Sequence, residues 1–500
     1  MTVVFVLLLS GCGVIGGGDS ETSSGTASKT EGQQEAFALG WAINDTVNPY
    51  KAKSKLNKEL STLLYDGLYT TAPDFSAVPR LAQACSTADD LVYYVSLKAN
   101  AVFTDTTQVT SDDVVYSFEA ARKSSSGGYK DMLNDIGTCT AVDLFTVCFT
   151  LKRLVPEFES LLVFPIIKAY SDEGETPYGT SATPVGTGRY VFNRNYGSAW
   201  LSSNGSWCCG NVNIQRIELV DVPDDEALSY YVEVGKVSSW YTDLSSETLP
   251  TYSGSYVPVD LRNVVFLVSN SENELLDDRM RRVISSCIDR ETLASSAYYG
   301  QALAANGIYS PAKSSTASYQ GMDTEKDSET VNRLLYEMGY TSKNSDGKLL
   351  GADGNPISFR LLCNSESSSR LSAARTIASA CALAGITVLV DSKPREEYLA
   401  AVEEGSFDLY LGEMKLNSNH DLTTLLNISG VGSASAAAGT YKKLKKGSAN
   451  LSEFIAAQDA DLSVMPLLYR RGVVVVTGRL TGLTPSSTDI YYNIQECALS

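Results

Sequence analysis

The chain has 500 residues, of which 43% are hydrophobic, and this is enough material for two or three packed domains. Its formal net charge of −18 at pH 7 argues against nucleic acid or anionic lipid as a partner of the folded part. Histidine occurs once, at His420, which argues against histidine-based metal clusters and a Ser-His-Asp catalytic set, so we expect no metal, no cofactor and no catalytic residue.

The first residues have the pattern of a lipoprotein signal. Residues 1–11 hold a short apolar run that ends in small residues, and Cys12 follows. Such a signal is cut just before the cysteine, so we expect residues 1–11 to be removed and Cys12 to be lipidated. The alternative for this run is an ordinary buried strand. Residues 12–35 are rich in Gly, Ser, Thr and Gln and predict a flexible tether.

Residues 64–120 carry the most specific pattern in the chain. An opening helix-to-turn segment precedes an alternating strand at 91–97, a turn at 103–105 and a helix that starts at Thr110. Thr110 can accept a hydrogen bond from the Asp113 amide, and Asp112 and Asp113 lie where the helix dipole favours negative charge.

The ten cysteines form no CxxC framework. Cys139 and Cys148 lie symmetrically about residues 143–144 in a predicted hairpin, where they either form a disulfide or stay as free thiols. Cys208 and Cys209 are adjacent in a predicted exposed loop, and the pattern suggests no role for them.

The middle of the chain alternates strands and helices. Residues 184–190 form a glycine-punctuated turn into a strand, without the strand-to-helix context of a phosphate-binding loop. Residues 217–222, 224–234 and 237–241 predict a βαβ unit, and 263–268 another strand. One apolar stripe then predicts an amphipathic helix, with Met280, Val283, Ile284, Cys287 and Ile288 on one face.

Three strands at 357–363, 386–390 and 407–411 alternate with helices at 369–384 and 395–404, which predicts a parallel sheet. Ligands bind outside the carboxyl ends of such strands. This rule selects a first set of candidate residues: Asn364, Ser365, Glu366, Glu413, Lys415 and Asn417. Glu413 and Lys415 are two apart on an extended segment, so they project to the same side. They could meet the two ends of a zwitterionic ligand or neutralise each other.

Aromatic and polar residues at other strand ends make a second set of candidates. These are Trp41 and Asn44 after the first strand, and Trp240, Tyr241 and Asp243 after the 237–241 strand. Aromatic side chains there could stack on a ligand, or they could pack within the core.

The sequences of several segments resemble those of one protein family. These are YDGL, VPRLA, VYYVSLK and SDDVVYSF, the turn PVGTGRY, the helix DDRMRRVISSCIDRETL, and PLLY followed by VVVV. The order and wording resemble the bacterial family 5 extracellular solute-binding proteins, which are the dipeptide- and oligopeptide-binding lipoproteins of ABC importers. The chain departs from the family at Thr106, where a glycine is usual, and at Arg189, where a proline is usual.

The resemblance implies an α/β fold of the large peptide-binding type, with two lobes and an extra subdomain inserted in the first. The expected parts are lobe I (36–55, 179–268 and 471–500), the inserted subdomain (56–178) and lobe II (269–470). Two or more crossings between lobes make a hinge that allows closure around a solute.

The resemblance also implies a function: a monomer, anchored outside the cytoplasmic membrane, that captures a peptide-like solute and delivers it to the permease of an ABC importer. In peptide-binding relatives an aspartate near the position of Asn417 holds the ligand's amino group, and Glu413 could replace it here. The alternatives are a peptide-sensing receptor, a carrier of a non-peptide solute, and a lipid-anchored hydrolase that would depend on His420 beside Asp421.

Overall fold

The computed structural model of the protein describes residues 37–126, 128–171, 183–245, 254–319, 321–322, 325–432, 435–478 and 480–499. The predicted signal, the tether and Cys12 lie outside the described residues and stay predictions. Within the described ranges, no helix has the length and apolar character that a bilayer crossing requires.

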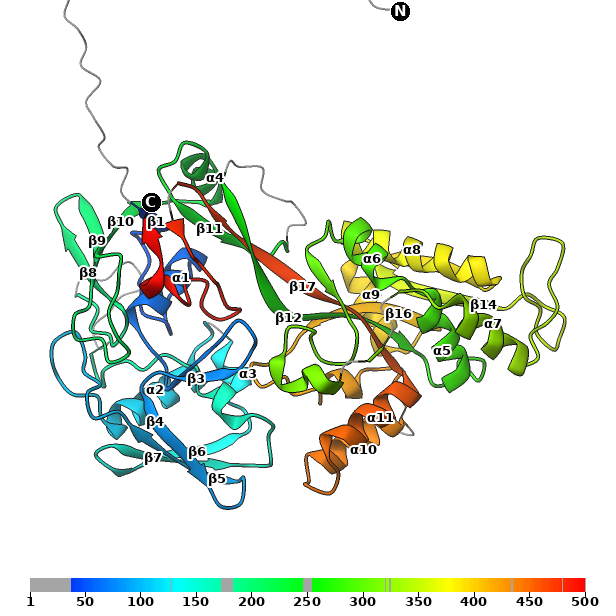
Figure 1. Cartoon of the computed structure of the whole chain (residues 1–500), viewed down its shortest axis with the longest axis horizontal. Coiled ribbons are helices and arrows are strands. Elements are labelled where there is room, and N and C mark those ends of the chain that lie inside the picture. Colours follow the sequence, from blue (N-terminus) through cyan, green and yellow to red (C-terminus); the bar gives the residue numbers. More distant parts are fainter. Residues whose placement is uncertain are drawn as a thin grey trace, which may run out of the picture. The chain divides into compact units, whose positions relative to one another are not determined.

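One sheet of eleven strands runs through the protein, in the order β15-β14-β16-β12-β17-β11-β1-β10-β9-β8, with β13 paired to β17 (Figure 1). Its strands are β1 (Ala38–Trp41), β8 (Tyr190–Asn195), β9 (Ser198–Ser203), β10 (Arg216–Asp221), β11 (Ser239–Thr242), β12 (Ser255–Ser269), β13 (Ala302–Ala304), β14 (Ser358–Asn364), β15 (Thr387–Lys393), β16 (Leu409–Lys415) and β17 (Val464–Val476).

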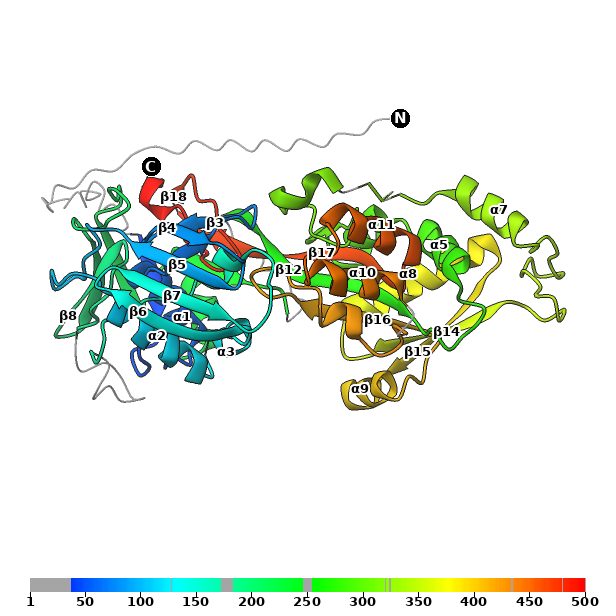
Figure 2. The same ribbon diagram turned by 90° about the horizontal axis from the view of Figure 1, so that it is seen from below.

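The strands β12 and β17 join the two halves of this sheet. They pair antiparallel from Ser255 opposite Val476 to Val268 opposite Val464, with two register shifts on the way. Figures 1 and 2 both show them running together from the half that holds β1 to the half that holds β14. The predicted strand at 263–268 is therefore part of a strand of 15 residues, β12, and the VVVV segment at 473–476 belongs to a strand of 13 residues, β17.

The alternation predicted for the second half is confirmed. β14, α8 (Ser368–Ala384), β15, α9 (Arg395–Glu403) and β16 follow each other, and β14 pairs parallel with both β15 and β16. Gly385 ends α8 with a φ of +94°, a conformation that favours glycine. Two apolar clusters stabilise this half, and they contain Ile377 and Leu409 in one and Leu362 and Tyr410 in the other.

In the first half, the predicted strand–helix–strand unit is β10, α4 (Asp225–Glu233) and β11, and β1 lies between the two strands, parallel to both. A separate four-stranded sheet has the order β4-β5-β7-β6, and β2 pairs with β3. These strands are β2 (Tyr69–Thr71), β3 (Ala77–Pro79), β4 (Ala82–Thr87), β5 (Val92–Leu97), β6 (Ile136–Asp143) and β7 (Thr146–Leu151), and the short pair β18 (Leu480–Thr481) and β19 (Ala498–Leu499) ends the chain.

Most of the other helices have an apolar stripe or a side-chain cap, and the four-residue α3 has neither. They are α1 (Lys55–Leu64), α2 (Ser111–Lys123), α3 (Tyr129–Met132), α5 (Asp278–Cys287), α6 (Arg290–Ala297), α7 (Ser328–Glu337), α10 (Ala436–Leu444) and α11 (Leu451–Asp461). The Thr110 N–H donates to the Asp113 carboxylate at 2.8 Å, which confirms the predicted start of α2. The predicted apolar face of α5 is also confirmed, since Met280, Val283 and Ile284 are buried.

The cysteines of the described residues are all free thiols. Cys148 lies opposite Thr140 in the β6–β7 hairpin, so it does not face Cys139 across the ladder. Cys208 and Cys209 are half-buried rather than fully exposed, with their sulfurs 3.6 Å apart and both near the Arg80 carbonyl.

The two glycines of the PVGTGR turn allow a close approach to the end of α1. A Cβ atom on Gly186 would lie 2.0 Å from the Leu64 oxygen, and one on Gly188 would lie 2.4 Å from the Leu63 oxygen. The Gly188 N–H donates to the Leu64 carbonyl at 2.9 Å. Glycine is required here because any side chain would collide with this backbone.

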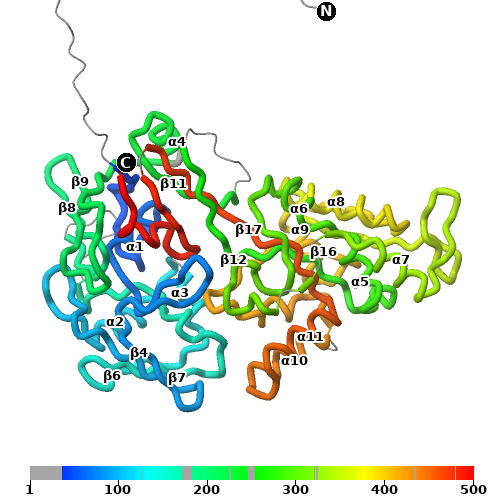
Figure 3. Tube along the Cα trace, viewed as in Figure 1, coloured from blue at the N-terminus to red at the C-terminus, as the bar shows by residue number. Residues whose placement is uncertain are grey.

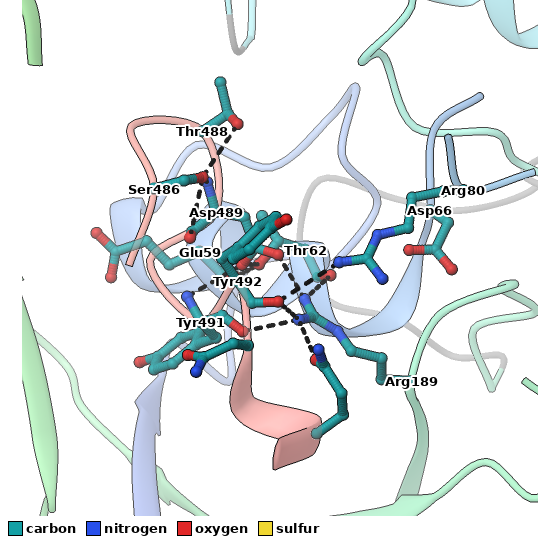
Figure 4. Close-up of polar contacts among 12 residues, drawn as sticks. Glu59, Thr62, Asp66, Arg80, Arg189, Ser486, Thr488, Asp489, Tyr491 and Tyr492 are labelled. Carbon is teal, nitrogen blue, oxygen red and sulfur yellow. Dashed lines mark hydrogen bonds and ion pairs between the residues drawn. The ribbon is translucent and has the colours of Figure 1, made fainter. Parts of the chain in front are cut away.

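Arg189, which follows this turn, ties three segments together inside the first half (Figure 4). Its Nη2 contacts Asp489 at 2.6 Å and the Thr62 carbonyl at 3.0 Å, and its Nη1 donates to the carbonyls of Tyr491 and Tyr492. Its side chain is 1% exposed. The C-terminal segment therefore lies beside α1 and β1, as the red and dark blue traces of Figure 3 show. This network accounts for an arginine where the family usually has proline.

Replacing Arg189 with alanine leaves Asp489 buried without its partner. We expect Arg189→Ala to lower the free energy of unfolding by about 3–5 kcal/mol, measured by urea denaturation. The matched control is Arg333→Ala, which removes an exposed pair with Glu337 and should cost about 0.5 kcal/mol or less. Equal losses in the two variants would contradict the anchoring role of Arg189.

Glu59 on α1 generates a prediction on pH. Burial raises the pKa of this carboxyl from 4.5 to about 8, Lys55 opposes the shift and Asp243 adds to it. A raised pKa in the folded state stabilises the fold below pH 4.5, and this contribution is lost as the pH rises toward 8. Between these pH values we expect the stability of the wild type to fall relative to that of Glu59→Gln, by up to roughly 1.4 kcal/mol per pH unit. Parallel stability curves for the two proteins would contradict the shift.

Candidate functional site

A pocket of about 800 Å³ lies at the carboxyl ends of β14 and β16. Its wall comes from β12, β14, β16, the starts of α8 and α9, and a loop at 424–429. The pocket therefore lies where the parallel-strand rule places a ligand. One lining residue, Ser245, comes from the loop after β11 in the first half of the sheet.

The structure brings together four residues of the first predicted set. Asn364, Glu366, Glu413 and Lys415 all line the pocket. Glu413 and Lys415 lie at the end of β16 itself rather than after it. Ser365 and Asn417 are absent from the described lining, and Asn417 is an exposed residue of the loop that follows β16.

Glu413 pairs with Arg470 and not with Lys415. Both Glu413 oxygens lie 3.3 Å from Arg470 Nη1, and one accepts a hydrogen bond from Asn263 at 3.0 Å. Arg470 also donates to the Leu244 carbonyl at 2.9 Å, so it links β17 to the loop after β11. Glu413 and Lys415 therefore do not neutralise each other, and Arg470 already balances the Glu413 charge that could have met a ligand amine.

Lys415 makes no salt bridge with any described residue. Desolvation by the surrounding protein lowers the pKa of Lys415 and nearby Arg262 lowers it further, while Asp243 opposes the shift. Arg262 itself is buried on β12, and burial lowers its pKa to about 10. Its Nε and Nη1 atoms have no hydrogen-bond partner among the described residues. Two cations thus lie near each other with little to balance them.

Two residues of the second predicted set lie elsewhere. Trp41 is 3% exposed, packs edge-on against Phe192 at 5.4 Å, and lines a different pocket of about 620 Å³. Asn44 is exposed in the turn after β1 and lines neither pocket. The Trp41 ring therefore packs in the core. This is one of the two interpretations of the strand-end aromatic residues, the other being stacking on a ligand.

Trp240 and Tyr241 lie within β11 rather than after it, Asp243 follows the strand, and none of the three lines the main pocket. Trp240 packs against the small cluster of Leu244, Val473 and Val475. The Tyr241 ring lies under the Lys55 ammonium at 4.6 Å. Burial would raise the pKa of Asp243, but hydrogen bonds from Ser245 outweigh it and the net shift is downward.

Several lining residues were not predicted. They include Arg370 and Arg395 in the first turns of α8 and α9, Tyr398 on α9, and Arg470 on β17. The sequence placed both helices correctly, so extending the strand-end rule to the helix starts would have found the two arginines. Arg470 could not have been found this way, because its strand follows the pocket segment by many residues.

Among the residues that the structure describes, His420 has no carboxylate partner suited to catalysis. The ring is buried and lies 4.9 Å from the Phe75 ring. Burial lowers the pKa of His420 well below its usual value, and Lys313 and Arg262 add to the shift. Asp421 instead pairs with Lys445 and accepts a hydrogen bond from Thr423. The described residues also contain no group of three or more His, Cys, Asp or Glu side chains that could hold a metal ion.

Comparison with known proteins agrees with this geometry. Residues 76–435 match the profile of the bacterial extracellular solute-binding proteins, family 5 (middle part). The oligopeptide-binding protein AppA of Bacillus subtilis is 23% identical over 389 residues, which cover 72% of this chain and 69% of AppA. These relatives are binding proteins of transporters and not enzymes.

Two solved structures show the same fold. The unliganded open form of MppA, a periplasmic murein tripeptide binding protein, has a TM-score of 0.75 and 17% identity, with 94% of this chain and 98% of MppA covered. A structure described as a nickel ABC transporter from Bacillus halodurans has a TM-score of 0.73 and 20% identity, with 92% and 98% covered. The matched profile covers well over half of the sequence and the fold is that of two-lobed binding proteins, so the chain belongs to family 5 of the bacterial extracellular solute-binding proteins, which serve ABC importers.

Proposed function

We propose that this protein captures a peptide in an extended conformation, by adding it as a strand to the free edge of β16, and delivers it to the permease of an ABC importer. The observation that carries the proposal is the unequal pairing of β16. It pairs with β12 along its whole length, from Leu409 to Lys415, but with β14 only at Leu409 and Tyr410. The rest of that second edge borders the pocket.

The backbone direction along this edge suits strand addition. Backbone groups of alternate residues point toward the paired strand, and those of the residues between point away. The Leu416 N–H donates to the Arg262 carbonyl of β12, whereas the Leu411 carbonyl accepts from the Tyr398 hydroxyl at 2.9 Å. By alternation, the N–H and C=O groups of Glu413 and Lys415 face away from β12. A peptide can use such groups for affinity, while side-chain pockets give specificity.

Closure of the lobes would complete the site. We propose the division made above, with lobe I at 36–55, 179–268 and 471–500, the inserted subdomain at 56–178, and lobe II at 269–470. β12 and β17 carry the chain between the lobes. Lobe II and the inserted subdomain already meet, since the Lys313 side chain contacts Glu157 at 2.6 Å and the Ser314 backbone N–H donates to the Asp74 carbonyl at 3.2 Å. These contacts are suited to hold a closed state around a solute.

Anchoring completes the proposal. Members of the family act outside the cytoplasm, and we propose that a lipid on Cys12 holds this protein, as a monomer, at the membrane surface. The tether of residues 12–35 would let it reach the permease. Asn417 is less suited to hold a ligand amine than the family's aspartate. Asp243 and Glu366 are the carboxylates near the pocket that could replace it, and Glu366 is exposed with one oxygen bonded to the Arg395 N–H.

Two alternatives remain within the same fold: a peptide-sensing receptor without a permease, and a carrier of a non-peptide solute, as the nickel-related structure illustrates. Native mass spectrometry of the full chain with Cys12→Ser, followed by release of the bound solute, separates the second from a peptide carrier. Peptide masses support the proposal, and a single non-peptide mass overturns it.

Strand addition predicts a specific pattern with a peptide identified in this way. Methylating one backbone nitrogen that faces β16 removes a donor, and we expect a loss of affinity of about tenfold or more by calorimetry. The matched control carries the methyl group on the next nitrogen, which points away from β16, and should bind nearly as tightly. Equal losses at all positions would contradict strand addition.

A further inference from the structure

The charged side chains that line the pocket are mostly cationic. The lining contains four cationic side chains and two carboxylates. The cations are Arg370, Arg395, Lys415 and Arg470, and the carboxylates are Glu366 and Glu413. This local excess of positive charge stands inside a protein with a net charge of −18. A cleft lined by one sign of charge attracts solutes of the opposite sign.

Both carboxylates already interact with protein groups. Glu413 is paired with Arg470 and bonded to Asn263, as described above. One Glu366 oxygen accepts a hydrogen bond from the Arg395 N–H at 3.1 Å, so it caps the start of α9. Neither carboxylate is therefore paired with the side chain of Arg370, Arg395 or Lys415.

These three cations form no salt bridge within the described ranges of the chain. The Nε atom of Arg370 is also closed to solvent without a hydrogen-bond partner there. Arg370 and Arg395 occupy the first turns of α8 and α9, where the helix dipole disfavours positive charge. No acidic residue in the first turn of α8 offsets this cost. In α9, Glu396 and Glu397 of the first turn offset the cost, so it is Arg370 that folding alone does not favour.

A fourth cation, Arg262, lies near Lys415. Arg262 precedes Asn263, which lines the pocket, and its side chain is nine-tenths buried. As noted, two of its guanidinium nitrogens lack a partner. Burying an unpaired cation is costly, and an anion nearby reduces that cost. Charge is thus left uncompensated at Lys415 on β16 and at the two arginines at the starts of α8 and α9.

We propose that the solute is anionic, with carboxylate groups that bind Lys415 on β16 and Arg370 and Arg395 at the starts of α8 and α9. This inference rests on the proposed peptide-binding function and names its substrate class: an acidic peptide that carries at least one side-chain carboxylate besides its C-terminus. Guanidinium groups bind carboxylates through two parallel hydrogen bonds, which suits the two arginines to this role.

The test compares three peptides of one length that differ at a single position, Glu, Gln or Lys, with the full Cys12→Ser chain. We expect the Glu peptide to bind about tenfold tighter than the Gln peptide and the Lys peptide to bind weakest, because a carboxylate forms charge-assisted hydrogen bonds with the cations. The preference should shrink as the salt concentration rises.

Variants locate the preference. If the side-chain carboxylate binds the two arginines, Arg370→Gln and Arg395→Gln should each reduce the Glu-over-Gln ratio several-fold, and Lys415→Gln should weaken both peptides alike through loss of the C-terminal contact. The reverse pattern assigns the two carboxylates the other way round, and an unchanged ratio in all three variants would overturn the proposal. Arg333→Gln, an exposed site on α7, should leave the ratio unchanged. A normal unfolding transition in each variant shows that the change concerns binding rather than folding.

The outcomes also separate this inference from the proposed function. Equal affinity for the Glu and Gln peptides would overturn the anionic class and leave peptide binding intact. If citrate, a small tricarboxylate, binds and none of the three peptides does, the result would support the anionic class of solute and overturn the proposed peptide-binding function. If neither the peptides nor citrate bind, both statements are wrong.

Discussion

The pairing of β12 with β17 is the constraint on which the rest of the structure depends. This antiparallel ladder is shared by both halves of the central sheet, so each half is built outward from it. β16 packs on the outer side of β12, and β11 packs on the outer side of β17. The pocket wall on β16 and the loop after β11 therefore have their positions set by the same two strands.

This arrangement explains why β16 has a free edge inside the protein. β14 pairs with β15 over seven residues but meets β16 at only two, because β16 follows β12 while β14 follows β15. The strands separate at their carboxyl ends, and the pocket occupies the space between them. An open edge is a liability unless something pairs with it. A binding protein can use that edge when its solute supplies the missing strand.

The local elements could be predicted from the sequence because short-range signals determine them. The α2 start at Thr110, the α5 stripe and the alternation from β14 to β16 all depend on spacing within one segment. The parallel-strand rule then placed Glu366, Glu413 and Lys415 at the pocket. Trp41 shows where this reasoning ends, since a strand-end aromatic residue looks the same in sequence whether it packs in the core or faces a ligand.

Long-range partners could not be predicted. Glu413 pairs with Arg470 and Arg189 pairs with Asp489, and in both cases the partner comes from a distant segment that only the tertiary fold brings near. The same holds for Arg262. That two of its nitrogens lack a hydrogen-bond partner among the described residues can be recognised only once the side chains around it are known. Charge balance inside a pocket is a property of the fold, so it has to be read from the structure.

Amide hydrogen exchange on the free and solute-bound protein tests the central claim most directly. If a solute adds to the edge of β16, the amides of Glu413 and Lys415 should exchange more slowly when it is bound, while the Gly412 and Met414 amides, which face β12, should change little. Protection that spreads evenly over β16, or that appears only at the backbone amides around the second pocket near Trp41, would contradict strand addition at this edge.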